Sequence, residues 1–317
     1  VSLALRNSAQ LPEATRRRIQ ELAGSMGYQP NPLVTALMRS RRSGTPRRFQ
    51  GQLALITRES FRQNPVLRKY QQAAAARARQ VGFEVEAVNL QEYGGDPRKL
   101  QRGLLARNMT GLLIGPLPDP AETIGLEWER FTAVAMTFSL KTPRLDRVES
   151  DYPAGMRMAL EACRERGYLR PAYLSTRKVE LRLHDGWRGA YLSAFPPGSA
   201  GGDFFLDDPV DGRAAFRKWF RRYRPDVLLG AGSVLAEARA ILGATRLHPP
   251  PATVQMDLND LATSQTGVYI GKERQCPPAV DLLVGKLLRN ETGVPASPQT
   301  VLVPPLWHEG ESLPRLG

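Results

Sequence analysis

The stretch FEVEAVNLQEYGGDPRKLQRGLLARNMTGLLIGPL, residues 83–117, carries the pattern that determines the fold. Residues 83–90 and 111–117 are short apolar runs that predict strands, and the second is apolar enough to be buried on both faces. Between them, residues 96–108 predict a helix capped at its start. A strand, a helix and a second strand in succession indicate a parallel sheet with a right-handed crossover.

The same alternation continues in both directions along the body of the chain and starts again after Asp151. We expect further strands at 51–58, 132–139, 171–176, 203–208, 226–232, 252–258, 267–271 and 300–307. We expect further helices at 66–81, 121–130, 153–167, 183–195, 213–223, 234–243 and 278–290. Two successive α/β units of similar size predict two lobes, with a ligand cleft at the carboxyl ends of their strands.

The segment before this body, residues 11–42, reads as two helices separated by a break. In the first, Ile19, Leu22, Ala23 and Met26 recur at the spacing of one apolar helix face. The sequence Pro30-Asn31-Pro32 ends that helix and allows a new short one over residues 33–40. Two turns of helix are unstable alone in water, so this second helix needs a surface to fold against.

Charge is concentrated in the same region. The 317 residues carry a net charge of +13, and residues 1–48, with nine Arg and two Glu, contribute +7 of it. A basic arm at one end of a chain is typical of proteins that bind a polyanion such as DNA. No apolar run is long enough to span a membrane.

Several motifs of this arm resemble the DNA-binding head of LacI-type transcriptional regulators. The matching residues are Val1-Ser2-Leu3-Ala4-Leu5, Thr15-Arg16, Gly27-Tyr28-Gln29-Pro30-Asn31 and the apolar run that ends at Leu37. Pro12 and Arg6-Asn7 depart from the family pattern, which has a Ser cap and Asn-Gly there. The resemblance implies that Val1 lies inside the recognition helix, so we expect the sequence to be a fragment truncated within the helix-turn-helix.

The resemblance also implies the organisation of the whole chain. The fold expected is an α/β, two-lobed, periplasmic-binding-protein-like body of two doubly wound parallel sheets, preceded by the remnant of an all-α head and a hinge helix. The head occupies residues 1–29, the hinge and basic linker 30–48, and the effector-binding and dimerisation domain 49–317. Its first lobe comprises about 49–150 and 267–297, and its second 151–262 and 298–317. The chain is expected to cross between lobes near Asp151, at 261–267 and at 295–299.

The family pattern assigns two sets of candidate binding residues. Those expected at DNA are Ser2, Leu3, Arg6, Thr15, Arg16, Tyr28, Asn31, Val34 and Leu37. Those expected at a small-molecule effector are Ser60, Phe61, Asn64, Arg182, Trp187, Ser233 and Asp257. The second set departs from the family at two places: Leu183 stands where the family has Arg, with Arg182 beside it, and Gly232-Ser233 replaces Asn-Asp. The loss of two polar anchors argues against a standard sugar effector.

Other chemistry has weaker support in the sequence. The stretch GAGSVLAEA at 230–238 follows a strand, but Leu235 occupies the third glycine position of a dinucleotide fingerprint. The three histidines lie in three different segments without metal-ligand spacing, and no catalytic set is recognisable. The two cysteines, Cys163 and Cys276, are far apart, which suits a reducing cytoplasm.

The function expected is therefore that of a ligand-responsive repressor in the cytoplasm. It would bind double-stranded operator DNA as a homodimer and respond to a small-molecule effector such as a sugar or derivative. No cofactor and no metal are expected, and the protein is not expected to be an enzyme. The alternative is a periplasmic-type small-molecule binding protein without DNA function, which would share the body but not need the basic helix and hinge. A doubly wound enzyme would need the catalytic set that the sequence lacks.

Overall fold

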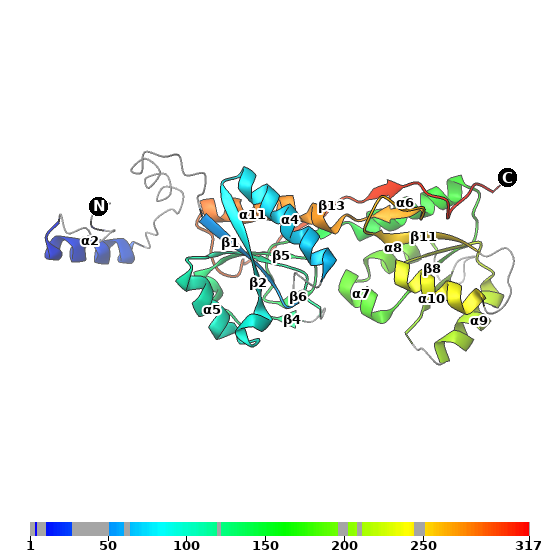
Figure 1. The fold of residues 1–317 in the computed structure, drawn as a ribbon, viewed down its shortest axis with the longest axis horizontal. Helices are drawn as coiled ribbons and strands as arrows, with labels where there is room; N and C mark the ends of the chain where they lie inside the picture. The colour runs from blue at the N-terminus through cyan, green and yellow to red at the C-terminus, as the bar shows by residue number, and fades with distance from the viewer. Residues whose placement is uncertain are drawn as a thin grey trace.

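The computed structural model describes residue 4 and residues 11–26, 51–59, 64–118, 122–195, 202–207, 211–243 and 251–316. Within these ranges the body forms two six-stranded sheets with helices packed around each, and the two resulting lobes lie end to end (Figure 1). The two-lobed α/β fold expected from the sequence is confirmed.

The first lobe is built on a wholly parallel sheet in the order β13-β7-β5-β3-β1-β2. Its strands are β1 (Gly51–Thr57), β2 (Phe83–Asn89), β3 (Gly111–Ile114), β5 (Thr132–Met136), β7 (Arg147–Ser150) and β13 (Thr300–Val303). Its helices are α4 (Pro65–Gln80), α5 (Pro97–Ala106) and α11 (Cys276–Leu288), with short 3-10 turns η1 (Leu90–Tyr93) and η2 (Trp128–Arg130). A separate parallel pair joins β4 (Glu122–Thr123) to β6 (Leu140–Thr142).

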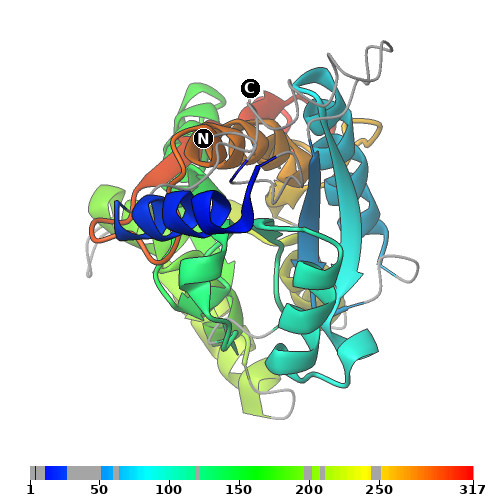
Figure 2. The ribbon, with the colours of Figure 1, turned by 90° about the vertical axis from the view of Figure 1, so that its left-hand side faces the viewer.

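Alternate residues of β1 supply the two apolar layers of the first lobe. Leu53 and Leu55 pack on the face covered by α4 and α11, whereas Ala54 and Ile56 pack on the face covered by α5. All four are at most 1% exposed. Because successive side chains of a strand point to opposite faces, this continuous apolar run marks a strand covered on both sides (Figure 2).

The second lobe repeats this design in the order β14-β12-β11-β10-β8-β9. Its strands are β8 (Pro171–Ser175), β9 (Gly202–Phe205), β10 (Val227–Gly230), β11 (Ala252–Leu258), β12 (Gly267–Tyr269) and β14 (Leu306–His308). Its helices are α6 (Tyr152–Glu165), α7 (Arg177–Leu183), α8 (Gly186–Ala194), α9 (Asp211–Tyr223) and α10 (Gly232–Gly243). All neighbours pair in parallel except β14, which runs antiparallel to β12.

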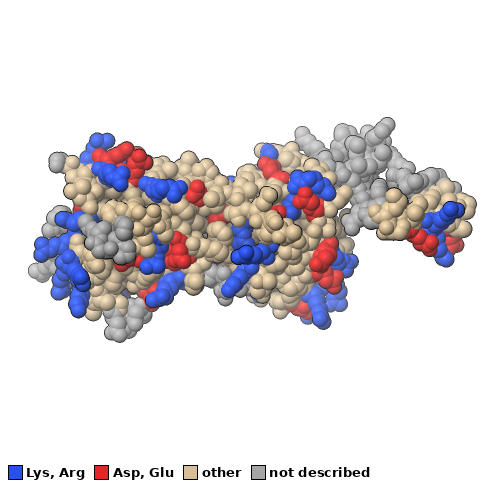
Figure 3. All heavy atoms as spheres, turned by 180° about the vertical axis from the view of Figure 1, so that it is seen from behind, with Lys and Arg blue, Asp and Glu red and all other residues tan. Residues whose placement is uncertain are grey.

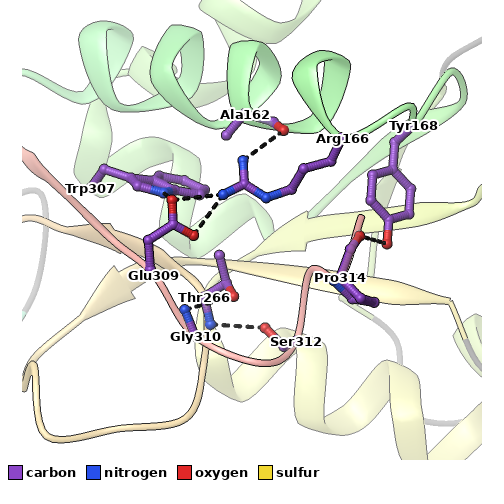
Figure 4. Close-up of polar contacts among 9 residues, drawn as sticks. All are labelled: Ala162, Arg166, Tyr168, Thr266, Trp307, Glu309, Gly310, Ser312 and Pro314. Carbon is purple, nitrogen blue, oxygen red and sulfur yellow. Dashed lines mark hydrogen bonds and ion pairs between the residues drawn. The ribbon is translucent and has the colours of Figure 1, made fainter. Parts of the chain in front are cut away.

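The C-terminal segment completes the second lobe by packing along α6 (Figure 4). The Arg166 guanidinium donates to both carboxylate oxygens of Glu309, at 2.7 and 2.6 Å, and lies 5.8 Å from the centre of the Trp307 ring. The Tyr168 hydroxyl donates to the carbonyl of Pro314 at 2.8 Å. These contacts hold the last strand and the chain after it against the helix that opens the lobe.

The chain crosses between the lobes three times, and two of the crossings differ from those expected. The first, at Asp151, is as expected. The second follows β12 and runs through the 3-10 turn η3 (Lys272–Gln275), so residues 267–269 belong to the second lobe, not the first. The third follows β13, which pairs with β7, so residues 300–303 belong to the first lobe, not the second.

Two prolines explain why the third crossing lies after residue 303 and not at 295–299, where we expected it. The apolar run 300–307 is one stretch in the sequence, yet it forms two strands in two different sheets. Pro304 and Pro305 separate β13 from β14. Proline has no amide to donate to a strand ladder, so pairing ends there and the chain changes lobe.

The described residues 122–130 do not form the helix that we expected over 121–130. Apart from β4 and η2, the described part of this segment has no regular structure. Ile124, Leu126 and Trp128 are buried, whereas the residues between them are exposed. This period of two is the signature of extended chain rather than of a helix, and it was present in the sequence.

The helix expected at 183–195 is shorter, and a helix before it was not expected. The expected helix corresponds to α8 (Gly186–Ala194), and α7 (Arg177–Leu183) precedes it. His184 and Asp185 both adopt the left-handed conformation, with φ of 51° and 55°, and separate the two helices. Such backbone angles are uncommon outside glycine, so the apolar pattern does not reveal the break. Thr176 caps α7 by accepting a hydrogen bond from the amide of Val179.

The N-terminal helix agrees with the sequence. Helix α2 (Glu13–Ser25) begins directly after Pro12. The Gln20 side chain donates to the carbonyl of Ala4 at 2.8 Å. Leu22 and Met26, on the expected apolar face, are 59% and 76% exposed. The expected hinge helix at 33–40 lies outside the described residues. No helix in the described ranges has the length and apolarity required to cross a membrane.

Candidate ligand cavity between the lobes

A cavity of about 440 Å³ lies where the two lobes meet. This volume is within the usual range for small-molecule sites. The first lobe contributes the chain after β1, the start of α4 and the chain after β3; the second contributes α7, α8, the start of α10 and the end of β11. The carboxyl ends of parallel strands therefore face the cavity from both sides, as expected for sheets of this kind.

The structure brings five of the seven expected effector residues to this cavity. They are Asn64, Arg182, Trp187, Ser233 and Asp257. Ser60 and Phe61 lie outside the described residues. Grouping these side chains in one cavity is a structural observation, whereas their role in binding remains a prediction.

Asn64 is held by the helix that it begins. Its side-chain oxygen accepts from the amides of Val66 at 3.0 Å and Leu67 at 3.3 Å, which caps α4. Its side-chain nitrogen donates to the Glu59 carboxylate at 2.7 Å. The capping bonds fix the Asn64 side chain at the cavity wall. The other carboxylate oxygen of Glu59 has no donor from the described residues.

Arg182 links the lobes across the cavity. From α7 it donates to two carbonyls of the chain after β3, those of Leu117 at 3.2 Å and Pro118 at 2.5 Å. A second inter-lobe hydrogen bond runs from the Lys69 ammonium to the carbonyl of Asn259 at 2.7 Å. Both contacts would have to break if the lobes moved apart.

A buried carboxylate orients the helix that carries Arg182. Glu180, also on α7, is 3% exposed, and one of its oxygens accepts from the Tyr173 hydroxyl at 2.6 Å and the Ser175 hydroxyl at 2.5 Å. Burial raises the pKa of Glu180, and the two hydroxyl hydrogen bonds oppose that rise. Both donors lie on β8, so they tie α7 to the sheet and fix which of its faces meets the cavity.

Asp257, at the end of β11, is oriented by its neighbours. One carboxylate oxygen accepts from the amide of Gly232 at 2.8 Å and from the side chain of Gln255 at 3.1 Å. The Gly232 amide lies at the start of α10, where a negative charge is favoured by the helix dipole. The second oxygen of Asp257 has no donor among the described residues.

Trp187 forms an apolar wall. It is 2% exposed, and its ring meets that of Tyr152 edge to face with 5.5 Å between centroids. Trp187 packs in the core of the second lobe and also lines the cavity.

Two lysines at the cavity escaped the sequence analysis. Lys178 lies on the exposed side of α7, and Lys272 lies in η3, just after the left-handed Gly271. Burial lowers the pKa of Lys272; the charge of Asp257 opposes this shift and that of Arg182 adds to it. Lys178 lies on a helix of less than two turns, which is too short to show an apolar period. Lys272 lies in a 3-10 turn at a crossing that we expected at other residues.

A polar network lies behind the cavity wall. Gln275 donates to the carboxylate of Glu149 at 3.0 Å and to the hydroxyl of Ser150 at 2.8 Å, and it accepts from the hydroxyl of Tyr70 at 3.2 Å. The hydroxyl of Tyr152 also donates to Glu149, at 2.9 Å. Burial raises the pKa of Glu149 to about 7, against the lowering effect of its hydrogen bonds. These residues come from β7, α4, α6 and η3, so the network joins the lobes at two of their crossings.

The groups at the cavity are donors, acceptors and apolar walls of the kind that hold a ligand in place. The described ranges contain no cluster of three His, Cys, Asp or Glu residues that could hold a metal ion. Cys163 and Cys276 are both buried and free, and burial raises the pKa of the Cys163 thiol to about 12. A thiol with so high a pKa is a poor nucleophile.

Of the nine residues expected at DNA, the structure describes two. Thr15 and Arg16 both lie on α2. Arg17, next to them, pairs with Glu13 at 3.1 Å in an exposed contact. The others lie outside the described residues: Ser2, Leu3, Arg6, Tyr28, Asn31, Val34 and Leu37.

Similar solved structures are transcriptional regulators. The lac repressor dimer bound to operator and the anti-inducer ONPF is 16% identical with a TM-score of 0.56, over 99% of this chain and 94% of that one. A complex of the transcriptional regulator CelR with cellobiose is 19% identical with a TM-score of 0.55, over 98% and 94%. A LacI family regulator from Enterococcus faecium with bound ribose is 13% identical with a TM-score of 0.57, over 84% and 100%.

At these identities the likeness establishes the fold. No family model matches the chain, and no curated protein matches it by sequence. The body expected from the resemblance in the sequence is thus the body that these regulators share.

Proposed function

We propose that this chain is a LacI-type transcriptional regulator that acts in the cytoplasm, represses by binding operator DNA as a homodimer, and changes its DNA affinity when a small molecule occupies the cavity between its lobes. It catalyses no reaction. The observation that carries the proposal is the presence, in one chain, of an arginine-rich helix at the N-terminal side and a ligand-sized cavity built from both lobes.

The position of the cavity supports a regulatory role. Its walls come from both lobes, and contacts such as those of Arg182 cross between them. A ligand in such a place binds one arrangement of the lobes better than another, and that difference is what a conformational switch requires. The lobes are joined by three chain segments, so a change in their arrangement can reach residues 27–50, which connect the body to α2.

The charge of α2 supports DNA as the partner. Arg17 and Arg18 are exposed on this helix, and its apolar Leu22 and Met26 are exposed as well. Phosphate contacts by arginines supply sequence-independent affinity, while base contacts supply specificity. A repressor with two-fold symmetry would bring two such heads to two half-sites. In this proposal Leu37 of the hinge helix enters the minor groove and bends the DNA.

The competing proposal is a ligand-binding protein without DNA function. It accounts for the cavity but gives no role to the nine arginines of residues 1–48. Selection of bound duplexes from a random pool by the full-length protein separates the two. We expect enrichment of a two-fold symmetric sequence, bound with an affinity that falls steeply as salt increases. A pool that stays random after repeated selection would contradict the proposal and leave the competing one.

A further inference from the structure

Among the described residues, the cavity lining has more cationic than anionic groups, and no ion pair joins them. Its ionisable basic residues are Lys178, Arg182 and Lys272, and its acidic residues are Glu59 and Asp257. No ion pair joins a basic to an acidic member of this set within the described residues. A cavity made only for a neutral molecule has no need of an excess of unpaired cations.

Lys272 is the cation that lies in the second crossing between the lobes. Its side chain is half-buried beside the cavity, and no hydrogen bond joins its ammonium group to an acceptor within the described residues. Partial removal of a charge from water is unfavourable when no partner replaces the lost water. The lowered pKa of Lys272 has burial as its main cause, which agrees with this geometry. An anion placed in the cavity would supply the missing partner.

The other groups indicate the rest of the ligand. Arg182 already donates to two carbonyls, so it contributes its charge to the cavity while holding the lobes together. Asp257 and Glu59 each keep one carboxylate oxygen without a protein donor in the described part. Free carboxylate oxygens accept hydrogen bonds from hydroxyl groups. Trp187 and Tyr152 give the apolar wall against which a carbon skeleton packs.

We infer that the cavity takes a polyhydroxylated small molecule that bears an anionic group, a carboxylate or a phosphate, with that group at Lys272 and the hydroxyls at Asp257 and Glu59. This rests on the proposed function in so far as the cavity is the effector site. It replaces the neutral sugar that the fold alone would suggest with a sugar acid or a sugar phosphate.

The test compares three probes of the same skeleton by isothermal titration calorimetry: gluconate, glucose 6-phosphate and glucose. We expect at least one anionic probe to bind about tenfold or more tightly than glucose, which corresponds to about 1.4 kcal/mol. Preference for gluconate alone identifies a carboxylate ligand, and preference for glucose 6-phosphate alone a phosphate. In Lys272→Met, which keeps the length of the side chain but removes its charge, the preference should disappear, whereas in Lys218→Met, on exposed α9, it should remain.

Three results would overturn the inference: binding of glucose as tight as that of both anions, absence of binding by both anions at millimolar concentration, or an undiminished preference in Lys272→Met. None of these three results bears on whether the protein selects a duplex DNA sequence. Failure of this inference is therefore distinguishable from failure of the proposed function, for which the DNA selection itself must fail.

A second measurement needs no ligand. If the Lys272 ammonium lacks a partner, Lys272→Met should raise the melting temperature of the ligand-free protein by about 2 °C, because an uncompensated charge is removed. If Lys272 instead holds the crossing together by pairing with Asp257, the same substitution lowers the melting temperature and the inference fails. Lys218→Met should leave the melting temperature unchanged.

Discussion

Two lysines, one in the second crossing between the lobes and one on the helix after it, have opposite surroundings. Lys286, on α11 in the first lobe, is 5% exposed and pairs with Asp146, which is 7% exposed, and with Glu291 at 3.3 Å. Lys272, on η3 at the cavity, has no carboxylate partner in the described part of the chain. The first lobe thus neutralises its buried charge internally, whereas the half-buried charge at the cavity has no carboxylate partner among the described residues. In our inference this difference separates a lysine that stabilises the fold from one that binds a ligand.

The largest effect should come from the paired lysine. Lys286→Met leaves Asp146 buried, with the amide of Gln299, at 2.8 Å, as the only donor to its side chain from the described part of the chain. Breaking one side of a buried ion pair typically costs about 3–5 kcal/mol of unfolding free energy. We expect a loss of this size, measured by urea denaturation followed through circular dichroism.

The control is the double variant Asp146→Asn with Lys286→Met. It removes both charges, so it should be more stable than Lys286→Met alone. A double variant that is less stable than either single variant would show that the pair does not act as described.

The next effect is a pH dependence that arises at the crossing network. Glu149 is 0% exposed, and burial raises its pKa from 4.5 to about 7. The folded state therefore binds more protons than the unfolded state between these values, and unfolding free energy contributed by the protonated carboxyl is lost as pH rises from about 4.5 to 7. Glu149→Gln should remove this loss, so that the variant gains about 3 kcal/mol relative to the original protein over that window.

The measurement is chemical denaturation of both proteins at several pH values. The difference between them, not either curve alone, isolates Glu149 from the other titrating groups. Parallel curves across the window would mean that the pKa of this carboxyl is not raised.

A smaller effect concerns the contact that joins the lobes. Arg182→Ala removes two hydrogen bonds to the chain after β3. Because both are only partly buried, we expect a combined loss of about 1.5 kcal/mol, at the lower end for such bonds. Amide hydrogen exchange in peptides that cover 111–118 and 177–183 should become about tenfold faster. Arg188→Ala, which breaks a pair with Asp203 within the second lobe, is the matched control and should leave residues 111–118 protected. If amide exchange in residues 111–118 were equally fast in both variants, Arg182 would not be the residue that holds the lobes together.

The smallest effect is on the salt dependence of DNA binding. Replacing Arg16 and Arg17 by Ala should reduce the slope of log affinity against log salt by about 1 for each lost phosphate contact. Helix α9 provides the control, since Arg221 and Arg222 are exposed on it, far from α2 along the molecule, where Figure 3 shows basic side chains gathered at the end of the second lobe. Replacing these two should leave the slope unchanged. A slope that changed on replacement of Arg221 and Arg222, but not of Arg16 and Arg17, would indicate that the DNA contacts the body.

The sequence predicted the repeating strands and helices well because burial leaves a pattern in each: a continuous apolar run in β3 and an amphipathic period in α5. The prediction failed where a local feature outweighs the pattern. Examples are the left-handed pair His184-Asp185, which separates α7 from α8, and the two prolines that divide 300–307 between two sheets. Neither leaves a trace in the period of apolar residues.

The cavity was predictable in part for a similar reason. The family pattern indicated Asn64, which lies between β1 and α4, and Asp257, which lies near the end of β11. The carboxyl ends of parallel strands meet at one edge of a sheet, so a cavity between the two sheets was expected there. Lys272 and Glu149 could not be found from the sequence. Both lie at crossings between the lobes, so their surroundings depend on where along the sequence the chain passes from one lobe to the other. The second crossing was expected at 261–267, several residues before η3. Misplacing it concealed the lysine that distinguishes this cavity.

The measurement that tests the central claim most directly is the affinity of the full-length protein for its selected duplex, by fluorescence anisotropy, with and without the probe that binds the cavity most tightly. If the cavity regulates DNA binding, the affinity should change by about fivefold or more, the lower range of coupling between two sites. The change should be absent in Lys272→Met, whose affinity without the probe should equal that of the original protein. An affinity that is the same with and without a probe bound in the cavity would contradict the account.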